Sequence, residues 1–356
     1  MANMKAFVKD GKCGGSVQSI PRPTLGDGEI LIKVHYAAVN PADWKMVEGD
    51  IVKGTSIPGV IAGCDFAGTV EVVNGTHWKK GQKVGGWVHG ATYRGIGSFA
   101  EFLCIEATLV FAVPDNITLQ QASTISLAFA TATQALYGYL GFSEPDEAHN
   151  ERGDILVYGA STSVGLYAVQ LGKLSNLRVI AVASVKNHDL LKSLGAEVTV
   201  DYHDNDWVDQ VKEITKGQLR YALDTIAEEG SSEKVVATLA CSDGAKLMAL
   251  SPVDKDSLYA INPCVKAESM MAFTVFGKAL GDEYAMFDHA GPPTPNEKVA
   301  WEKHLRLVTG MLERGDLKPN PVKQVGTLTD VGEAFRLIKE GKLSAEKAVL
   351  RIADGE

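Results

Sequence analysis

Residues 152–251 alternate apolar, strand-like runs with segments of helical periodicity, and this alternation limits the possible folds more than any other feature. The strand-like runs read DILVYGA, RVIAVAS, EVTVDY, YALDTI and AKLMALS, and we expect one more strand around MMAFTVFG. Strict alternation with short connections predicts a parallel sheet flanked by helices.

The segments on either side of this stretch follow a different pattern. The first 120 residues hold short alternating runs punctuated by Gly and Pro, among them KAFVK, EILIKVHYAAV and SFAEFLCI. This pattern predicts an antiparallel, barrel-like unit. A helix of about five turns is expected over residues 120–140, and residues 321–352 return to the mixed strand and helix pattern. The simplest organisation is a nucleotide-binding domain inserted between two halves of another domain.

The stretch VYGASTSVGLYAVQLGKL, residues 157–174, has the pattern of the first strand, turn and helix of a dinucleotide-binding fold. In such a turn, small residues permit a tight bend and bring backbone N–H groups close to a pyrophosphate at the helix N-terminus. Ala160 and Gly165 keep the small first and last positions, whereas Thr162 stands at the central one. Taken alone, an ordinary strand–turn–helix explains the stretch equally well. The residues that we expect to bind the cofactor here are Ser161, Thr162, Ser163 and Val164.

The run RVIAVAS ends at Ser184 and is followed by Val185, Lys186 and Asn187. A site selective for NAD places an acid here to bind the 2′-hydroxyl of the adenosine ribose, and this corner contains none. Its hydroxyl, ammonium and amide groups suit a 2′-phosphate, and Tyr202 is expected near the same pocket. The alternative for Lys186 is a solvated loop lysine. Together with the turn, the corner favours NADPH over NADH.

Composition excludes several classes of function. The 356 residues carry a formal net charge of −9, which argues against a nucleic-acid-binding surface. Five cysteines occur without CxxC spacing, so neither a disulfide framework nor a structural zinc lobe is indicated. Neither a signal peptide nor an apolar run of the roughly 20 residues that span a bilayer is evident. We therefore expect a cytoplasmic protein with no nucleic-acid or membrane partner.

The chain resembles the medium-chain dehydrogenase/reductase superfamily from about Lys5 to Ile352. The stretches that carry the resemblance are AAVNPADWKM, IPGVIAGCDFAGTVEVV, GSFAEF, YGASTSVGLYAVQLGKL, SLGAEVTVDY and LSAEKAVLRI. Within the superfamily it is most similar to the zinc-free enoyl and quinone reductases, in particular the fungal trans-acting enoyl reductases of polyketide pathways. The resemblance implies an α/β fold, with a Rossmann-type doubly wound parallel sheet inserted in a GroES-like, mostly antiparallel β-barrel catalytic domain. The expected domains are residues 127–280 for NADPH binding, and 1–126 with 281–356 for catalysis.

Zinc alcohol dehydrogenases of the superfamily place a cysteine soon after the second strand, and a His–Glu pair in the stretch that matches GCDFAG. This sequence has Asn40-Pro41-Ala42-Asp43 at the first place and Cys64-Asp65 at the second. A catalytic zinc needs three protein ligands and an open position, so we expect no metal. Cys64 is then a small buried apolar residue.

Without a metal, reduction of an activated double bond is easier to arrange than reduction of an isolated ketone. The resemblance implies hydride transfer from NADPH to the β-carbon of a conjugated C=C bond in an enoyl thioester, enone, enal or quinone. It implies catalytic roles for Lys45 and Thr131, with Thr131 also contacting substrate. For Lys45, enolate stabilisation, phosphate or ribose binding and proton donation all stay open. The alternatives are a surface lysine for Lys45 and a helix-core threonine for Thr131. Further cofactor contacts are implied for Asp43, Trp44, Lys45, Leu250, Ser251, Ala348 and Val349, and substrate contacts for Val275, Phe276 and Gly277.

Two other functions stay open from the sequence. One is zinc-free carbonyl reduction of the alcohol dehydrogenase type. The other is a non-catalytic NADPH-binding protein similar to the lens crystallins related to quinone reductases. The expected partner is a small-molecule or carrier-bound unsaturated carbonyl substrate, and the resemblance extends this to a polyketide synthase.

Overall fold

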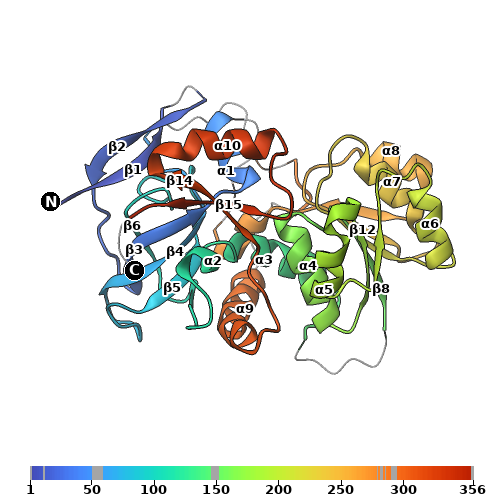
Figure 1. Cartoon of the computed structure of the whole chain (residues 1–356), viewed down its shortest axis with the longest axis horizontal. Coiled ribbons are helices and arrows are strands. Elements are labelled where there is room, and N and C mark those ends of the chain that lie inside the picture. The colour runs from blue at the N-terminus through green and yellow to red at the C-terminus, as the bar shows by residue number, and fades with distance from the viewer. Residues whose placement is uncertain are drawn as a thin grey trace. The chain divides into compact units, whose positions relative to one another are not determined.

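The computed structural model describes residues 2–10, 13–49, 59–145, 152–278, 280, 284, 286–289 and 295–353. The chain divides into two compact units (Figure 1). Unit 1 comprises Met1–Leu127 and Val299–Glu356, and unit 2 comprises Ala128–Lys298. The domain boundaries expected at 126/127 and 280/281 stay a prediction.

Unit 2 is built on a parallel sheet, which has six strands within the described residues. The strands are β8 (Asp154–Tyr158), β9 (Arg178–Val182), β10 (Val198–Val200), β11 (Tyr221–Asp224), β12 (Lys246–Ala249) and β13 (Lys266–Ser269). Their order across the sheet is β10-β9-β8-β11-β12-β13, and every neighbouring pair is parallel. This is the strand order of a doubly wound dinucleotide-binding fold. From β8 the chain adds β9 and β10 on one side, and then β11, β12 and β13 on the other side, so the order of strands reverses between β8 and β11. The Rossmann-type sheet is therefore confirmed.

Helices cover both faces of this sheet, with α4 and α5 on one side and α6, α7 and α8 on the other (Figure 1). Their bounds are α4 (Ser163–Leu174), α5 (His188–Leu194), α6 (Trp207–Ile214), α7 (Ser231–Thr238) and α8 (Lys255–Ile261), with 3-10 turns η2 (Val185–Asn187) and η3 (Ala272–Phe276). Trp207 and Val211 of α6 pack with Val235 and Val236 of α7 on Leu156 of the sheet. The buried face of each helix thus explains the apolar periodicity of the sequence.

The prediction of a strand around MMAFTVFG is wrong. The sixth strand, β13, lies earlier, and Ala272–Phe276 forms the 3-10 turn η3. β13 is an edge strand that pairs only with β12 among the described strands, so a short polar run suffices for it. The apolar residues that follow are buried without joining the sheet.

Unit 1 is mainly antiparallel, as expected, and consists of two sheets within the described residues. The strands are β1 (Asn3–Lys9), β2 (Gly15–Pro21), β3 (Glu29–Ala38), β4 (Asp65–Val73), β5 (Lys83–Trp87), β6 (Phe102–Glu106), β7 (Val110–Ala112), β14 (Val322–Thr327) and β15 (Lys347–Arg351). β1 pairs with β2, and the larger sheet has the order β14-β15-β3-β4-β5-β7 with β6 against β3. β14 and β15 form its one parallel pair among these strands.

The helices of unit 1 are α1 (Pro41–Glu48), α2 (Leu119–Ala122) and α10 (Val331–Lys339), with the 3-10 turn η5 (Leu328–Asp330). The chain passes between units within α3 (Ser126–Thr133) and again within α9 (Pro295–Arg314). The single helix expected over residues 120–140 is instead α2, α3 and a π-helical segment, η1 (Gln134–Tyr139). Ser123 and Thr124 donate their hydroxyls to carbonyls three residues earlier, which tightens the chain between α2 and α3.

Candidate active site

The turn between β8 and α4 is organised by the hydroxyl of Thr162. Its Oγ1 caps α4 by accepting from Gly165 N at 3.0 Å, and it donates to Thr225 Oγ1 at 2.9 Å. Thr225 Oγ1 in turn lies 2.9 Å from the carbonyl oxygens of Tyr158 and Gly159. The Thr162 N–H donates to Gly159 O at 2.9 Å. Both donors of Thr162 are therefore used within the protein, and this residue builds the turn.

Two glycines of the stretch GASTSVG are required by close packing. Gly159 has φ +68°, and a Cβ there would lie 2.4 Å from Thr225 Oγ1. A Cβ on Gly165 would lie 2.4 Å from the carbonyl oxygen of Gly159. Glycine at 165 lets helix α4 approach the end of β8 this closely, and glycine at 159 leaves room for the Thr225 and Ile226 side chains that follow β11. The turn is thus an intact dinucleotide-type turn in which the Thr162 cap stands at the central position.

Three more residues predicted to bind the cofactor, Ser161, Ser163 and Val164, are half-buried at the start of α4. The first N–H groups of a helix have no partner within it, and they lie at the positive end of the helix dipole. A pyrophosphate fits the chemistry of this helix start.

The corner after β9 brings two predicted residues into contact. Ser184 donates its hydroxyl to Tyr202 Oη at 3.2 Å. Lys186 is exposed in η2 and forms no ion pair with any described residue, whereas Asn187 of the same turn is buried. Asp201, beside Tyr202, accepts from the backbone N–H of His203 at 3.0 Å and lies 2.7 Å from its Nδ1. Ser184 and Tyr202 thus form a hydroxyl pair, and Lys186 follows Ser184 by two positions in the chain. A 2′-phosphate pocket at this corner stays a prediction.

A buried carboxylate, Asp224, ends the central strand β11. It accepts from the backbone N–H groups of Ile226 and Ala227, each at 2.9 Å. It also accepts from the hydroxyls of Ser231 at 2.6 Å and Ser232 at 2.8 Å. These four bonds hold the β11–α7 loop, and they were not predicted from the sequence.

The other predicted residues of unit 2 lie directly after β12, within α3, and within or directly after η3. Leu250 and Ser251 are half-buried directly after β12, and Leu250 N donates to the carbonyl of Asp224 at 3.2 Å. Thr131 is buried in α3. Val275 is buried in η3, Phe276 is half-buried, and Gly277 is exposed with φ +66°.

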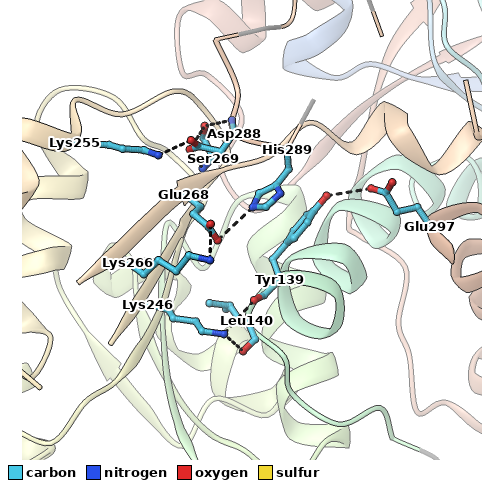
Figure 2. A network of polar contacts seen from close by, with 10 residues as sticks. All are labelled: Tyr139, Leu140, Lys246, Lys255, Lys266, Glu268, Ser269, Asp288, His289 and Glu297. Atoms are coloured by element: carbon cyan, nitrogen blue, oxygen red, sulfur yellow. Dashed lines mark hydrogen bonds and ion pairs between the residues drawn. The ribbon is translucent and has the colours of Figure 1, made fainter. Parts of the chain in front are cut away.

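A polar network anchors η3 and the end of β13. Thr274 of η3 donates to Glu297 Oε1 at 2.7 Å and accepts from Gln134 at 3.1 Å. Tyr139 donates to the same Glu297 oxygen at 3.2 Å, and its ring stacks on His289 with centroids 4.0 Å apart (Figure 2). Burial, assisted by the Glu297 carboxylate, raises the pKa of Tyr139, so this phenol stays a donor. The network holds in place the segment predicted to contact substrate.

Figure 2 also shows how charged pairs hold the β13 strand. Glu268 lies 2.7 Å from Lys266 and 3.3 Å from His289 Nε2. Asp288 accepts from Ser269 N at 2.8 Å and pairs with Lys255 at 2.5 Å. Partial burial acts to raise the pKa of Asp288, but the Lys255 ammonium and the Ser269 hydrogen bonds together outweigh it and lower this pKa.

In unit 1, a buried ion pair lies beside the start of α1. Lys347 Nζ lies 3.0 Å from Asp65 Oδ2 and donates to Asn40 Oδ1 at 2.6 Å, and both charged side chains are almost wholly excluded from solvent. Asn40 Nδ2 donates to the same Asp65 oxygen at 2.9 Å, and Leu127 N donates to Asp65 Oδ1 at 2.7 Å. The residue Asn40, from the family-like stretch NPADWK, is thus fixed by a lysine 307 positions away.

Asp43 completes the capping box of α1 by accepting from Asn40 N at 2.7 Å. Burial raises the pKa of Asp43 to about 6, against the opposing effect of hydrogen bonds from Cys64 and Asn40. Burial and the neighbouring Asp43 raise the pKa of the Cys64 thiol well above its usual range. Cys64 is therefore a protonated, buried thiol, as expected from the sequence.

Trp44 and Lys45 follow on α1, and both are half-buried. Lys45 Nζ lies 5.7 Å from the centre of the Trp44 ring, and Lys339 Nζ lies 5.3 Å from it. Ala348 and Val349 are fully buried in β15, and Ala348 O accepts from Val39 N at 2.9 Å. The structure thus brings the predicted residues of α1 and of β15 to one corner of unit 1.

The comparisons with known proteins agree with this architecture. Residues 26–115 match the family model of the alcohol dehydrogenase GroES-like domain, and residues 163–289 match that of the zinc-binding dehydrogenases. The trans-enoyl reductase ACTTS2 of Alternaria alternata is 32% identical, over 99% of this chain and 100% of that protein. The chain belongs to the medium-chain dehydrogenase/reductase superfamily. It is thereby an oxidoreductase with an NAD(P)-binding domain and a GroES-like domain.

Two further proteins show the range of the likeness, one in sequence and one in fold. A zinc-type alcohol dehydrogenase-like protein of Schizosaccharomyces pombe is 35% identical, over 98% of this chain and 100% of that protein. The NADPH complex of a mycobacterial protein superposes with a TM-score of 0.73 at 22% identity, covering 98% of this chain and 99% of that one. Among the described residues, no helix is both long enough and apolar enough to cross a bilayer.

The second family model is named for zinc, but the residues present do not suit a catalytic zinc. Lys347 already places an ammonium against Asn40 and Asp65, and the Cys64 thiol keeps its proton. Within the described ranges, no three His, Cys, Asp or Glu side chains gather as a metal would require.

Proposed function

We propose that this protein is a zinc-independent, NADPH-dependent reductase of conjugated C=C bonds. The observation that carries the proposal is the Lys347–Asp65–Asn40 cluster, in which a buried ammonium contacts Asn40 and Asp65. These two residues belong to the stretches where the family resemblance implies the zinc ligands of the alcohol dehydrogenases. A reductase without a Lewis acid is best suited to an activated alkene, because the negative charge that develops on hydride addition spreads into the adjacent carbonyl. Full-length similarity to a trans-enoyl reductase supports the same class of reaction.

The residues of unit 2 fit NADPH. The start of α4, with Ser161, Ser163 and Val164, would hold the pyrophosphate through backbone N–H groups. Ser184, Lys186 and Tyr202 would hold the 2′-phosphate, and the 3.2 Å hydrogen bond already joins two of them. A mycobacterial protein of the same fold was solved with NADPH, which agrees with this choice. When bound, NADPH supplies the hydride that adds to the β-carbon of the substrate.

Lys45 and Thr131 are the proposed catalytic residues. The Lys45 ammonium would stabilise negative charge on the carbonyl oxygen, and the Thr131 hydroxyl would orient the substrate. The capping box of Asn40 and Asp43 holds the helix that carries Lys45. Asp43, Trp44, Leu250, Ser251, Ala348 and Val349 remain proposed cofactor contacts.

The proposed substrates are enoyl thioesters, enones, enals and quinones, free or bound to a carrier. Val275, Phe276 and Gly277 would contribute to the substrate pocket. A trans-acting role beside a polyketide synthase is the form of this proposal that the Alternaria relative favours. The S. pombe relative favours a second candidate, carbonyl reduction, which the same assay distinguishes.

The test is NADPH oxidation with a panel of conjugated acceptors and matched saturated ketones. We expect NADPH oxidation with the conjugated acceptors only. NADPH oxidation with the saturated ketones, and not with the conjugated acceptors, would establish carbonyl reduction instead. Activity with neither, despite NADPH binding, would indicate a non-catalytic protein.

The cofactor assignment is tested with Lys186→Ala and Ser184→Ala. Each removes a group facing the 2′-phosphate, so we expect KM for NADPH to rise about 10-fold or more with KM for NADH unchanged. Lys192→Ala is the matched control, because Lys192 is an exposed lysine of the neighbouring helix α5. An unchanged ratio of NADPH to NADH efficiency in both variants would rule out this pocket.

A further inference from the structure

Two cysteines of unit 2 lie against each other outside the site described above. Cys241 Sγ and Cys264 Sγ are 3.1 Å apart, and both are free thiols. Cys241 lies in the turn before β12, and Cys264 lies in the turn before β13. Since β12 and β13 are parallel neighbours, both turns lie at the amino ends of the strands. The residues proposed to bind cofactor and substrate follow the carboxyl ends of the same strands.

The backbones of the two turns are already tied together. Buried Asn262 donates through Nδ2 to the carbonyls of Leu239 and Ala240, each at 3.2 Å. Its Oδ1 accepts from Cys264 N at 3.1 Å. One amide side chain therefore holds the segment before Cys241 against the segment that carries Cys264. To form a disulfide, the two Sγ atoms need to move only about 1 Å closer together than they are in this structure.

The two thiols differ in access, and the pKa of Cys264 is raised. Cys241 is exposed, whereas Cys264 is partly buried. The hydrogen bond with Cys241, followed by burial and the nearby Asp243 carboxylate, raises the pKa of Cys264. Cys264 thus tends to keep its proton and donate it to the neighbouring sulfur. An external reagent accordingly reaches Cys241 first.

We propose that Cys241 and Cys264 form a reversible intramolecular disulfide when the chain meets a low-molecular-weight disulfide such as oxidised glutathione. The Cys241 thiolate attacks one glutathione sulfur, and the other glutathione leaves as a thiolate. The deprotonated Cys264 then attacks the Cys241 sulfur of the mixed disulfide and expels the second glutathione. Two protein thiols lose two electrons and two protons, and glutathione disulfide is reduced to two glutathione thiols.

The cross-link would join residues 23 positions apart and connect the two outermost strands on this side of the sheet. Closing such a loop restricts the unfolded chain, so the oxidised protein should resist heat better than the reduced one. The inference does not depend on the proposed enzymatic function, and its test needs no substrate.

The experiment compares the full-length protein with Cys241→Ser, Cys264→Ser and Cys13→Ser after exposure to oxidised glutathione. Cys13→Ser is the matched control, because Cys13 is an exposed cysteine of unit 1. We expect wild type and Cys13→Ser to lose two hydrogens in intact mass, with peptide mapping that locates the bond at 241–264. The midpoint of thermal unfolding of unit 2 should rise by about 5 °C or more and return on reduction.

The single variants at the pair should instead trap one glutathione on the remaining thiol. Wild type that retains two free thiols at 241 and 264, or that accumulates only the glutathione adduct, would overturn the proposal. So would a bond that maps to any other pair of cysteines.

Discussion

Replacement of Lys347 by Met tests whether the buried ion pair of unit 1 holds the α1 corner. The Lys347 side chain is 1% exposed and its partner Asp65 is 0% exposed, with 3.0 Å between Nζ and Oδ2. Methionine has a similar length and no charge, so the substitution removes the ammonium with little change in packing. It leaves the Asp65 carboxylate without its counter-charge in a region closed to water.

The expected loss follows from that burial. Breaking a buried pair by removing one partner costs about 3–5 kcal/mol, because the remaining charge is uncompensated. Asp65 keeps two other donors, Asn40 Nδ2 and Leu127 N. We therefore expect the free energy of unfolding of unit 1 to fall by about 3 kcal/mol. Asp65→Asn combined with Lys347→Met removes both charges and should lose less than the single variant.

The matched control is Lys80→Met. Lys80 pairs with Glu71 in the same unit at the same 3.0 Å, but its side chain is 70% exposed. Exposed pairs contribute about 0–1 kcal/mol, so this variant should be close to wild type. The two variants thus differ in burial rather than in chemistry or distance.

The assay is urea unfolding followed by tryptophan fluorescence. Four of the five tryptophans belong to unit 1, so the signal reports mainly on that unit. Lys347→Met should unfold at a clearly lower urea concentration than Lys80→Met, with a similar slope. If the free energies of unfolding of the two variants differ by less than about 0.5 kcal/mol, burial of the Lys347–Asp65 pair does not stabilise unit 1 as expected.

Two further predictions concern stability. Burial raises the pKa of Asp43 from its usual 3.8 to about 6, so between these pH values the folded chain binds a proton that the unfolded chain does not. The free energy of unfolding of wild type should therefore fall by about 3 kcal/mol as pH rises through this window. Asp43→Asn keeps an oxygen that accepts from Asn40 N–H but carries no titrating group. Its free energy of unfolding relative to wild type should therefore rise between pH 4 and 6. If the difference between variant and wild type does not change with pH, the pKa of Asp43 is not raised. Gly165→Ala should destabilise unit 2 by about 1–3 kcal/mol in thermal unfolding, because its Cβ would lie 2.4 Å from Gly159 O, whereas Gly332→Ala in α10, with open space around it, should not. Equal effects of the two alanines would refute the close-packing explanation.

Much of the fold was predictable because its pattern is local. Helices and strands of the nucleotide-binding unit repeat apolar residues with the periods that burial on a sheet imposes. The turn GASTSVG was also recognisable, since glycine is required where strand and helix backbones meet. The edge strand β13 escaped prediction because an edge position needs little apolar character, while the apolar run after it is buried in η3.

The candidate site was predictable only in part. The sequence by itself determined which residue types stand at the cofactor turn and at the acid-free corner after β9. Only the tertiary structure decided that Thr162 uses its hydroxyl on Thr225, 63 positions away, and that Lys347 reaches Asp65 across 282 positions. A lysine among the apolar residues of β15 was the one signal for the latter pair. Periodicity records which side of an element is buried, whereas the partner of a buried polar group depends on how distant segments align, which local sequence does not encode.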